Sequence, residues 1–168
     1  LGSTISGNLS LGGATRTFSI ADSTTAVTDL AIPAVISESA QAGITKTGTG
    51  TLELSGANTF TGATAVQGGI LSIDSLANVN AGPSALGNPA DATAGTIKLG
   101  LTTAVTTLRY TGGGSTTNRV IDLAGTTVGP TIDASGTGAL VFTSNFTASG
   151  AGAKTLTLTG SNTHPNHK

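Results

Sequence analysis

The stretch that decides the fold is GITKTGTGTLELSGANTFTGATAVQGGILSI, residues 43–73. Polar and apolar residues alternate through Thr51–Ser55, so Leu52 and Leu54 point to the same side of a β-strand. The stretch closes on a second such run, in which Leu71 and Ile73 form the next inward pair. It therefore predicts two short strands whose aliphatic side chains fill one interior.

The residues between these two runs predict two bends. Gly56 to Asn58 is expected to turn the first corner, because Asn tolerates left-handed backbone and its amide can form a ladder with neighbouring coils. Phe60 is expected to pack at the bend, and Gly62 lets the chain turn again.

Short alternating runs of this kind occur along the whole chain, each bounded by Gly, Asn, Asp or Pro. No apolar pattern with a period of 3.6 residues persists for three helical turns, so helices are not expected. The further runs that predict strands are Ile5–Leu11, Thr17–Ile20, Leu30–Ile36, Thr96–Leu101, Val120–Leu123, Ala139–Phe142 and Thr155–Thr159.

The chain also repeats itself at a fixed interval. Thr51–Thr59 matches Thr155–Thr163, and Arg16–Ala21 matches Arg119–Ala124, so residues 16–59 recur as residues 119–163. A period of about 104 residues is the mark of a repeat architecture. The second copy ends at a tail, residues 164–168, and its core and corner positions are Leu156, Leu158, Gly160 and Asn162.

Composition favours a β-solenoid over a sandwich or barrel of hairpins. Thr (32), Gly (25), Ala (23) and Ser (16) dominate the chain, and only 9% of residues are charged. Small and β-branched side chains suit coils stacked about 4.8 Å apart, and like charges stacked in register would repel. Asn-Gly and Asp-Gly hairpin turns are missing. We expect one all-β parallel β-helix of about seven to nine coils over residues 1–168.

The same composition excludes several classes of function. Seven scattered Lys and Arg residues and a net charge of −1 provide no basic surface for nucleic acid. No run of eighteen apolar residues could span a membrane, and the absence of cysteine excludes disulfides and thiolate metal sites.

Residues 43–73 resemble the autotransporter-associated β-strand repeat, also called the passenger-associated transport repeat, and residues 152–163 resemble part of a second copy. The resemblance implies a right-handed parallel β-helix, exported by a bacterium to its surface or the medium, whose repeats aid export and folding. The positions that carry it are Lys46, Gly48, Gly50, Thr51, Leu52, Leu54, Ser55, Gly56, Asn58, Thr59, Phe60, Thr61, Gly62, Gly69 and Leu71.

Candidate chemical groups are sparse. Parallel β-helices can carry polysaccharide-cleaving sites, which need clustered carboxylates, and Asp122 and Asp133 with Arg119 nearby form the best candidate. Solvated strand faces explain the eight scattered acids more simply. Arg16 and Arg119 occupy matching repeat positions, where packing of their stems or pairing with Asp22 and Asp122 is expected. We therefore expect no catalytic residue and no cofactor.

Two further patterns, a histidine pair and the Thr-x-Thr pairs, are weaker candidates for a functional site. His164 and His167 lie in the tail beside Pro165, so no metal site is expected there. Flat arrays of Thr-x-Thr on a solenoid can bind ice, but here the pairs recur irregularly. These pairs are Thr15/Thr17, Thr45/Thr47, Thr49/Thr51 and Thr155/Thr157/Thr159.

The expected function is structural, without catalysis: a stalk, spacer or fibre element of a secreted or cell-surface protein. Its expected partners are neighbouring coils of a longer parent chain or head-to-tail copies of itself, because coils without caps expose unpaired backbone groups. The alternative is an adhesive or glycan-binding module that contacts a host or matrix surface. Two less favoured hypotheses for the function are a polysaccharide-cleaving enzyme and an ice-binding solenoid.

Overall fold

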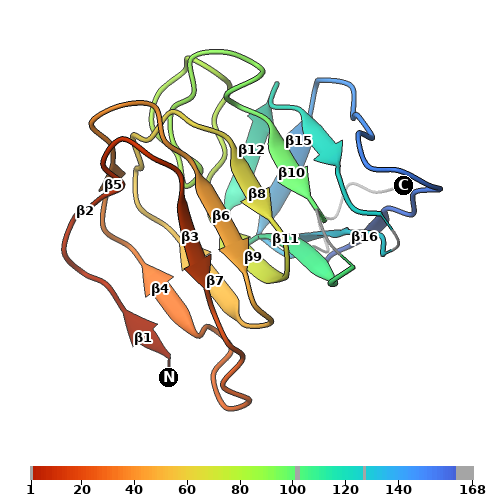
Figure 1. Ribbon diagram of the computed structural model, residues 1–168, viewed down its shortest axis with the longest axis horizontal. Helices are drawn as coiled ribbons and strands as arrows, with labels where there is room; N and C mark the ends of the chain where they lie inside the picture. The colour runs from red at the N-terminus through yellow and green to blue at the C-terminus, as the bar shows by residue number, and fades with distance from the viewer. Residues whose placement is uncertain (1, 101–102, 127, 162–168) are drawn as a thin grey trace.

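The structure is a computed structural model that describes residues 2–100, 103–126 and 128–161. Within these ranges the protein consists of sixteen short β-strands and contains no helix (Figure 1), so no helix with the length and apolarity to cross a bilayer occurs there. All twelve strand pairs in the described part of the chain are parallel. The prediction of an all-β fold of stacked parallel strands is confirmed.

The strands form two large sheets and two small ones. The first sheet has the order β1 (Ser3–Thr4), β4 (Leu30–Ile32), β7 (Thr51–Leu54), β9 (Gly69–Ile73), β11 (Thr106–Tyr110), β14 (Thr131–Ala134), β16 (Thr157–Thr159). The second sheet has the order β3 (Arg16–Ser19), β6 (Ile44–Thr47), β8 (Thr64–Val66), β10 (Ile97–Leu99), β13 (Ile121–Leu123). The small sheets pair β2 (Leu9–Ser10) with β5 (Ile36–Ser37), and β12 (Gly113–Thr117) with β15 (Gly138–Phe142).

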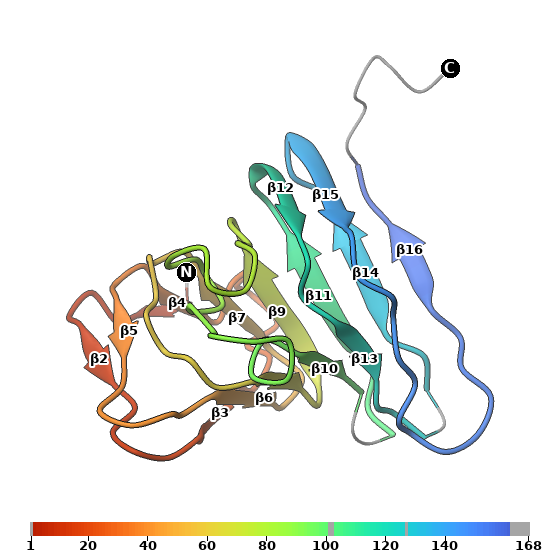
Figure 2. The same ribbon diagram turned by 90° about the horizontal axis from the view of Figure 1, so that it is seen from above.

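The chain winds from sheet to sheet, and strands that pair are never consecutive in the sequence. Figure 1 shows β3, β6, β8 and β10 side by side, and Figure 2 shows the early strands at one end of the stack and the late strands at the other. Each circuit of the chain adds one strand to the first sheet. This winding is typical of a β-solenoid.

The strand register stacks aliphatic side chains into continuous interior columns. In the first sheet, Leu52 is paired with Leu71, and Leu54 with Ile73, and all four are fully buried. Burying one such side chain stabilises the fold by about 1.5–3 kcal/mol. The longer column through the first sheet comprises Leu30, Leu52, Leu71, Leu108, Ile132 and Leu158.

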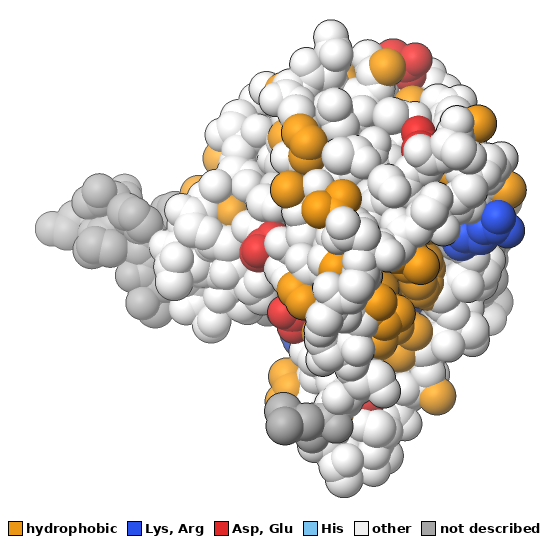
Figure 3. Space-filling model, turned by 90° about the vertical axis from the view of Figure 1, so that its left-hand side faces the viewer, with side chains coloured by type: hydrophobic (Ala, Val, Ile, Leu, Met, Phe, Trp, Pro, Cys, Tyr) orange, Lys and Arg blue, Asp and Glu red, His pale blue; other side chains and the backbone are white. Residues whose placement is uncertain are grey.

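The interior is less well covered toward the ends of the stack. Ile5 and Phe18, from the first coil, are only partly buried, whereas Leu158 in β16 is 71% exposed. Figure 3 views the side of the first coil and shows hydrophobic side chains gathered there. Apolar surface at both ends therefore faces outward from the stack.

The longest excursion of the described chain is residues 74–96, between β9 and β10. Side chains of the following coil hold it: the amide of Leu76 donates to Ser115 Oγ (3.2 Å), and Thr117 Oγ1 donates to the carbonyl of Ala77 (2.9 Å). This loop is therefore anchored along its length, although it belongs to no strand.

Candidate functional site

The first group of predicted residues lies in the interior. Leu52, Leu54 and Leu71 are fully buried in the columns described above, and Phe60 is also fully buried. The carbonyl of Phe60 accepts a hydrogen bond from the amide of Asn88 (2.9 Å), which ties the 74–96 loop to the preceding coil. These side chains hold coils together and offer no chemistry to solvent.

Asn58 connects three successive coils through its side chain. Its Oδ1 accepts a hydrogen bond from the amide of Ile36 (2.7 Å), and its Nδ2 donates to the carbonyl of Ala85 (2.7 Å). The residue is fully buried, and its φ is not positive. The Asn58 side chain thus bridges β5 and the 74–96 loop. It supplies hydrogen-bond partners for main-chain groups, the amide of Ile36 and the carbonyl of Ala85, in place of a paired strand.

The predicted corner glycines share a steric property. A Cβ added at Gly56, Gly62 or Gly160 would fall within 2.4 Å of a main-chain atom of the preceding coil. Such a contact is far inside van der Waals distance, so the coils can approach this closely only where the side chain is absent.

The side chains of the second copy of the motif are less buried than those of the first copy. Leu156 is partly buried and packs against the core, whereas Leu158 is the exposed end of the first-sheet column. Asn162 and the tail, 164–168, lie outside the described residues.

A feature that the sequence interpretation missed is the burial of two cations. Lys46, inward-facing in β6, is fully buried, and its Nζ donates to the carbonyls of Thr47 (2.9 Å), Gly48 (3.0 Å) and Gly68 (3.0 Å). Burial lowers the pKa of Lys46 to about 8, and the negative charge of Asp29 acts in the opposite direction. Lys46 thus joins the corners of two successive coils.

Arg119 is the second buried cation. Its Nε donates to the carbonyl of Gly95 (2.8 Å) and its Nη1 to that of Leu86 (2.7 Å), whereas its Nη2 has no partner. Burial lowers the pKa of Arg119 to about 10. The matching Arg16 is exposed and donates from Nε to the carbonyl of Leu11 (2.7 Å). Both arginines thus bind main-chain carbonyls, and neither forms the expected ion pair with Asp22 or Asp122 in the described structure.

The candidate catalytic carboxylates are not brought together. Asp122 lies in β13 of the second sheet and Asp133 in β14 of the first sheet, where Asp133 pairs with Arg109 (2.9 Å). Asp122 accepts hydrogen bonds from Ser149 and Thr147; burial acts to raise its pKa, but these bonds hold the pKa below its usual range. Among the described residues, no three His, Cys, Asp or Glu side chains are grouped as a metal site would require.

The threonines do not form a flat array on the second sheet. The outward column that begins with Thr17 and Thr45 continues with Ala65, Lys98 and Asp122. An ice-binding surface needs the same side chain on every coil, and this column changes at the third strand.

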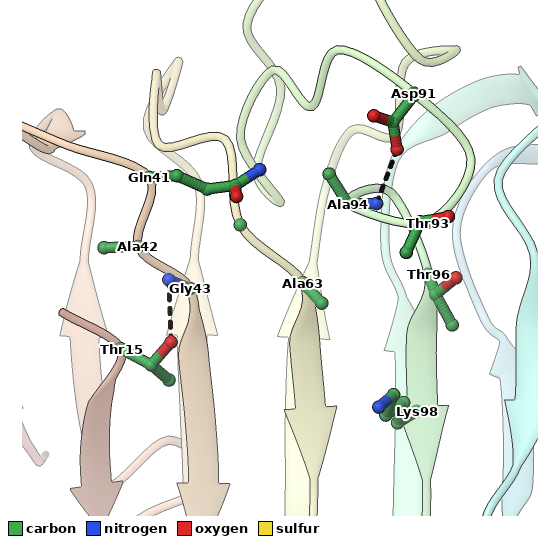
Figure 4. Close-up of a pocket in the computed structure, with 11 residues that line it drawn as sticks. Thr15, Gln41, Ala42, Gly43, Ala63, Asp91, Thr93, Ala94, Thr96 and Lys98 are labelled. Carbon is green, nitrogen blue, oxygen red and sulfur yellow. Dashed lines mark hydrogen bonds between the residues drawn. The ribbon is translucent and has the colours of Figure 1, made fainter.

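The outer side of the second sheet instead carries an open groove formed by two cavities of about 450 and 360 Å³, the second of which is lined mainly by apolar surface. The cavities adjoin, because Thr93, Thr96 and Lys98 line both. Figure 4 shows the first cavity, with Gln41 extending toward the loop that carries Asp91 and with Lys98 on the strand below. The other polar side chains that line the groove are Thr15 in the first cavity and Asp122, Thr147 and Ser149 in the second.

Comparisons with known proteins agree with this architecture. Residues 44–73 and 151–164 match the family described as passenger-associated-transport-repeat. The chain is 37% identical over 169 residues, covering 98% of its length, to a protein of Brucella suis biovar 1 (strain 1330) named "Adhesin BmaC autotransporter". The chain spans 5% of the length of that relative. No solved structure matches the chain significantly.

Both copies of the repeat that the sequence predicted are thus matched by the family model, and the chain is similar to a short part of an autotransporter. These comparisons indicate a bacterial cell-surface or extracellular protein, in agreement with the expected localisation.

Proposed function

We propose that this chain is a non-catalytic structural segment, a stalk or spacer of a surface protein, built as a right-handed parallel β-helix of about seven to nine coils. The observation that carries the proposal is the unbroken first sheet, in which seven parallel strands stack and six of them contribute to one continuous aliphatic column. Right-handed crossovers between parallel strands are the rule in proteins. At about 4.8 Å per coil, such a stack is roughly 35–45 Å long.

Apolar side chains exposed at the ends of the stack support the proposal that its partners are further coils. Leu158 and the partly buried side chains of the first coil offer apolar surface that a further coil would cover. Neighbouring coils of a parent chain, or a second copy stacked head to tail, fit that surface. The repeat of residues 16–59 at 119–163 is consistent with a single unit that continues along one axis.

A tandem protein tests this function. Two copies of the chain joined directly should scatter X-rays as one rod roughly twice as long as the single chain, if its coils are spacer units. Two bodies that tumble independently would contradict the proposal. Electron microscopy of the single chain at micromolar concentration separates a spacer, seen as dispersed rods, from a fibre element, seen as unbranched filaments.

A second candidate function is adhesion, which the name of the Brucella relative favours. In this reading a lateral face of the solenoid binds a host or matrix surface, while the coils serve as its scaffold. Saturable binding of the chain to cells or matrix would support it.

A further inference from the structure

The outer face of the first sheet carries side chains that are aligned from coil to coil. Leu52, Leu71 and Leu108 point into the interior, so the residues on either side of them in β7, β9 and β11 point outward. The outward side chains form two columns: Thr51, Ile70 and Thr107 in one, and Glu53, Ser72 and Arg109 in the other. A partner that packs on this face meets both columns, and their order decides which partner fits.

The charges of this face are ordered so that they complement an inverted copy of the same face. The strands of the first sheet contain three charged residues, and all three share one outward column: Glu53 in β7, Arg109 in β11 and Asp133 in β14. Between Glu53 and Arg109 lies the uncharged Ser72 of β9. A twofold rotation about an axis along β9, in the gap between two facing copies, places β7 of each copy over β11 of the other. Glu53 and Arg109 then face each other twice.

Rotation about the neighbouring strands brings like charges together instead. An axis along β7 would place Glu53 over its own counterpart, and axes along β11 and β14 would do the same for Arg109 and Asp133. Like charges that face each other across an interface oppose binding. The axis along β9 avoids all three contacts, because it places Asp133 over Ala31 of β4.

Glu53 and Arg109 are both held in place and both keep capacity for a further partner. Thr28 Oγ1 donates to Glu53 Oε2 (2.9 Å), and a carboxylate can accept through its other oxygen as well. Arg109 Nε donates to Asp133 Oδ2 (2.9 Å), and the Nη atoms of a guanidinium carry further donors. Because both side chains are fixed before a second copy arrives, pairing would lose little conformational entropy.

An apolar hollow beside these columns complements the charges. It has a volume of about 490 Å³, and its mainly apolar lining comes from the corners that precede β7, β9 and β11 and from the start of these strands. Val105 forms one wall and is 64% exposed. Val105 and Thr49 occupy equivalent positions before β11 and β7, so the same rotation places Val105 over Thr49 of the second copy, at the opposite wall of its hollow. Two copies would thus cover each other's exposed apolar surface.

We propose that two copies of this chain pair side by side through the outer faces of their first sheets, around a twofold axis along β9. The side chains nearest the axis are the apolar Ile70 and the small Ser72, which suit sheets packed face to face about 10 Å apart. The two solenoids run in opposite directions, the arrangement that links proteins reaching out from two opposing surfaces. The inference goes beyond the stalk function and does not depend on it, since a stalk without this pairing is still a stalk.

Sedimentation equilibrium of the 168-residue chain at low salt tests the pairing. The chain should show a monomer–dimer equilibrium whose Kd rises with salt concentration, because salt screens the charges between the copies. Glu53→Arg and Arg109→Glu should each raise the dimer Kd at least about tenfold, since like charges then face each other twice. An equimolar mixture of the two variants should regain the dimer, because each variant presents the charge that the other lacks. Lys98→Glu is the matched control: Lys98 lies beside Asp122 in the second sheet, as Arg109 lies beside Asp133 in the first.

Three outcomes would overturn the proposal. They are a chain that stays monomeric at millimolar concentration, a dimer that Lys98→Glu weakens as much as Arg109→Glu does, and a mixture that stays monomeric although circular dichroism shows both variants folded. Association that none of the variants weakens would indicate end-to-end stacking of coils. That result would support a fibre element and would overturn the pairing through the first sheet.

Cross-linking decides the matter if Arg109→Glu fails to fold. The chain contains no cysteine, so a single introduced thiol reports its own distance to the second copy. Ile70→Cys, next to the axis, should be joined into a covalent dimer by a short bismaleimide, whereas Thr17→Cys, exposed in β3 of the second sheet, should stay a monomer. Equal cross-linking of the two variants, or cross-linking of neither, would overturn the proposed pairing.

Discussion

Replacing Thr64 by Val is expected to stabilise this protein. Thr64 is fully buried in β8, and its Oγ1 has no hydrogen-bond partner. In the second-sheet register it lies between Ile44 of β6 and Ile97 of β10, which are both fully buried. The hydroxyl therefore lies in an aliphatic column, where a methyl group would pack against the neighbouring isoleucines.

The size of the gain follows from this environment. A buried polar group without a partner costs about 1–3 kcal/mol, and valine has almost the same shape as threonine, so the exchange removes that cost without overpacking. The added methyl group contributes up to about 0.8 kcal/mol more. The main-chain ladder is untouched, because the amide of Thr64 still donates to the carbonyl of Thr96 (3.3 Å). We expect a net stabilisation of about 1–3 kcal/mol.

Urea unfolding followed by circular dichroism checks this value. With a slope of about 1–3 kcal/mol per molar, the midpoint should rise by roughly 1 M while the slope stays constant. Thr17→Val is the matched control, because Thr17 lies exposed in β3 of the same sheet and its exchange should change stability by less than about 0.5 kcal/mol. A Thr64→Val midpoint equal to or below that of the wild type would refute the reasoning.

Three further perturbations probe the corners. Gly62→Ala should destabilise the fold by about 1–3 kcal/mol in urea unfolding, because its Cβ would lie 2.4 Å from the backbone, whereas Gly7→Ala, with nothing within 4 Å, should be nearly silent; equal effects would contradict the steric argument. Asn58→Ala should cost about 2–4 kcal/mol and speed hydrogen exchange at the amide of Ile36, which loses its acceptor; unchanged exchange there would count against the bridge. Because the pKa of Lys46 is about 8 in the folded state and about 10.5 when unfolded, the unfolded state holds more protons between these values, so stability should rise from pH 8 to pH 10.5. Lys46→Met should flatten that rise, and identical pH profiles would show that Lys46 does not titrate in this window.

The sequence predicted the strands whose alternation is undisturbed. The runs that contain β7, β9 and β16 were read correctly from their paired leucines and isoleucines. The expected runs did not include β1, β6, β8, β11, β12 and β14, and two of these strands show why. In β6 the inward position after Ile44 is a lysine, which breaks the apolar pattern. In β12 the glycines Gly113 and Gly114 looked like a loop, yet a Cβ on the neighbouring Gly138 would fall 2.0 Å from the carbonyl of Gly113.

The stacking register also differs from the alignment of the sequence repeat. The repeat matches Leu52 with Leu156, whereas the first-sheet column continues from Leu52 to Leu158. The offset of two residues keeps each leucine on the same face, so alternation alone does not reveal it. Coils of unequal length, such as the one that carries residues 74–96, set the register instead. For the same reason, the groove on the second sheet could not be foreseen, since its lining residues lie on six successive coils.

The two buried cations stabilise irregular main chain outside the strands, although the protein has few charged residues. At a solenoid corner the main chain leaves the ladder, and its carbonyls lose their strand partners. A neutral side chain can satisfy one or two of these groups, but an ammonium or guanidinium donates several hydrogen bonds at once. Lys46 thereby binds carbonyls of two successive coils, and Arg119 binds the carbonyls of Leu86, in the middle of the anchored loop, and of Gly95, near its end. In this protein, then, the two cations cross-link irregular backbone.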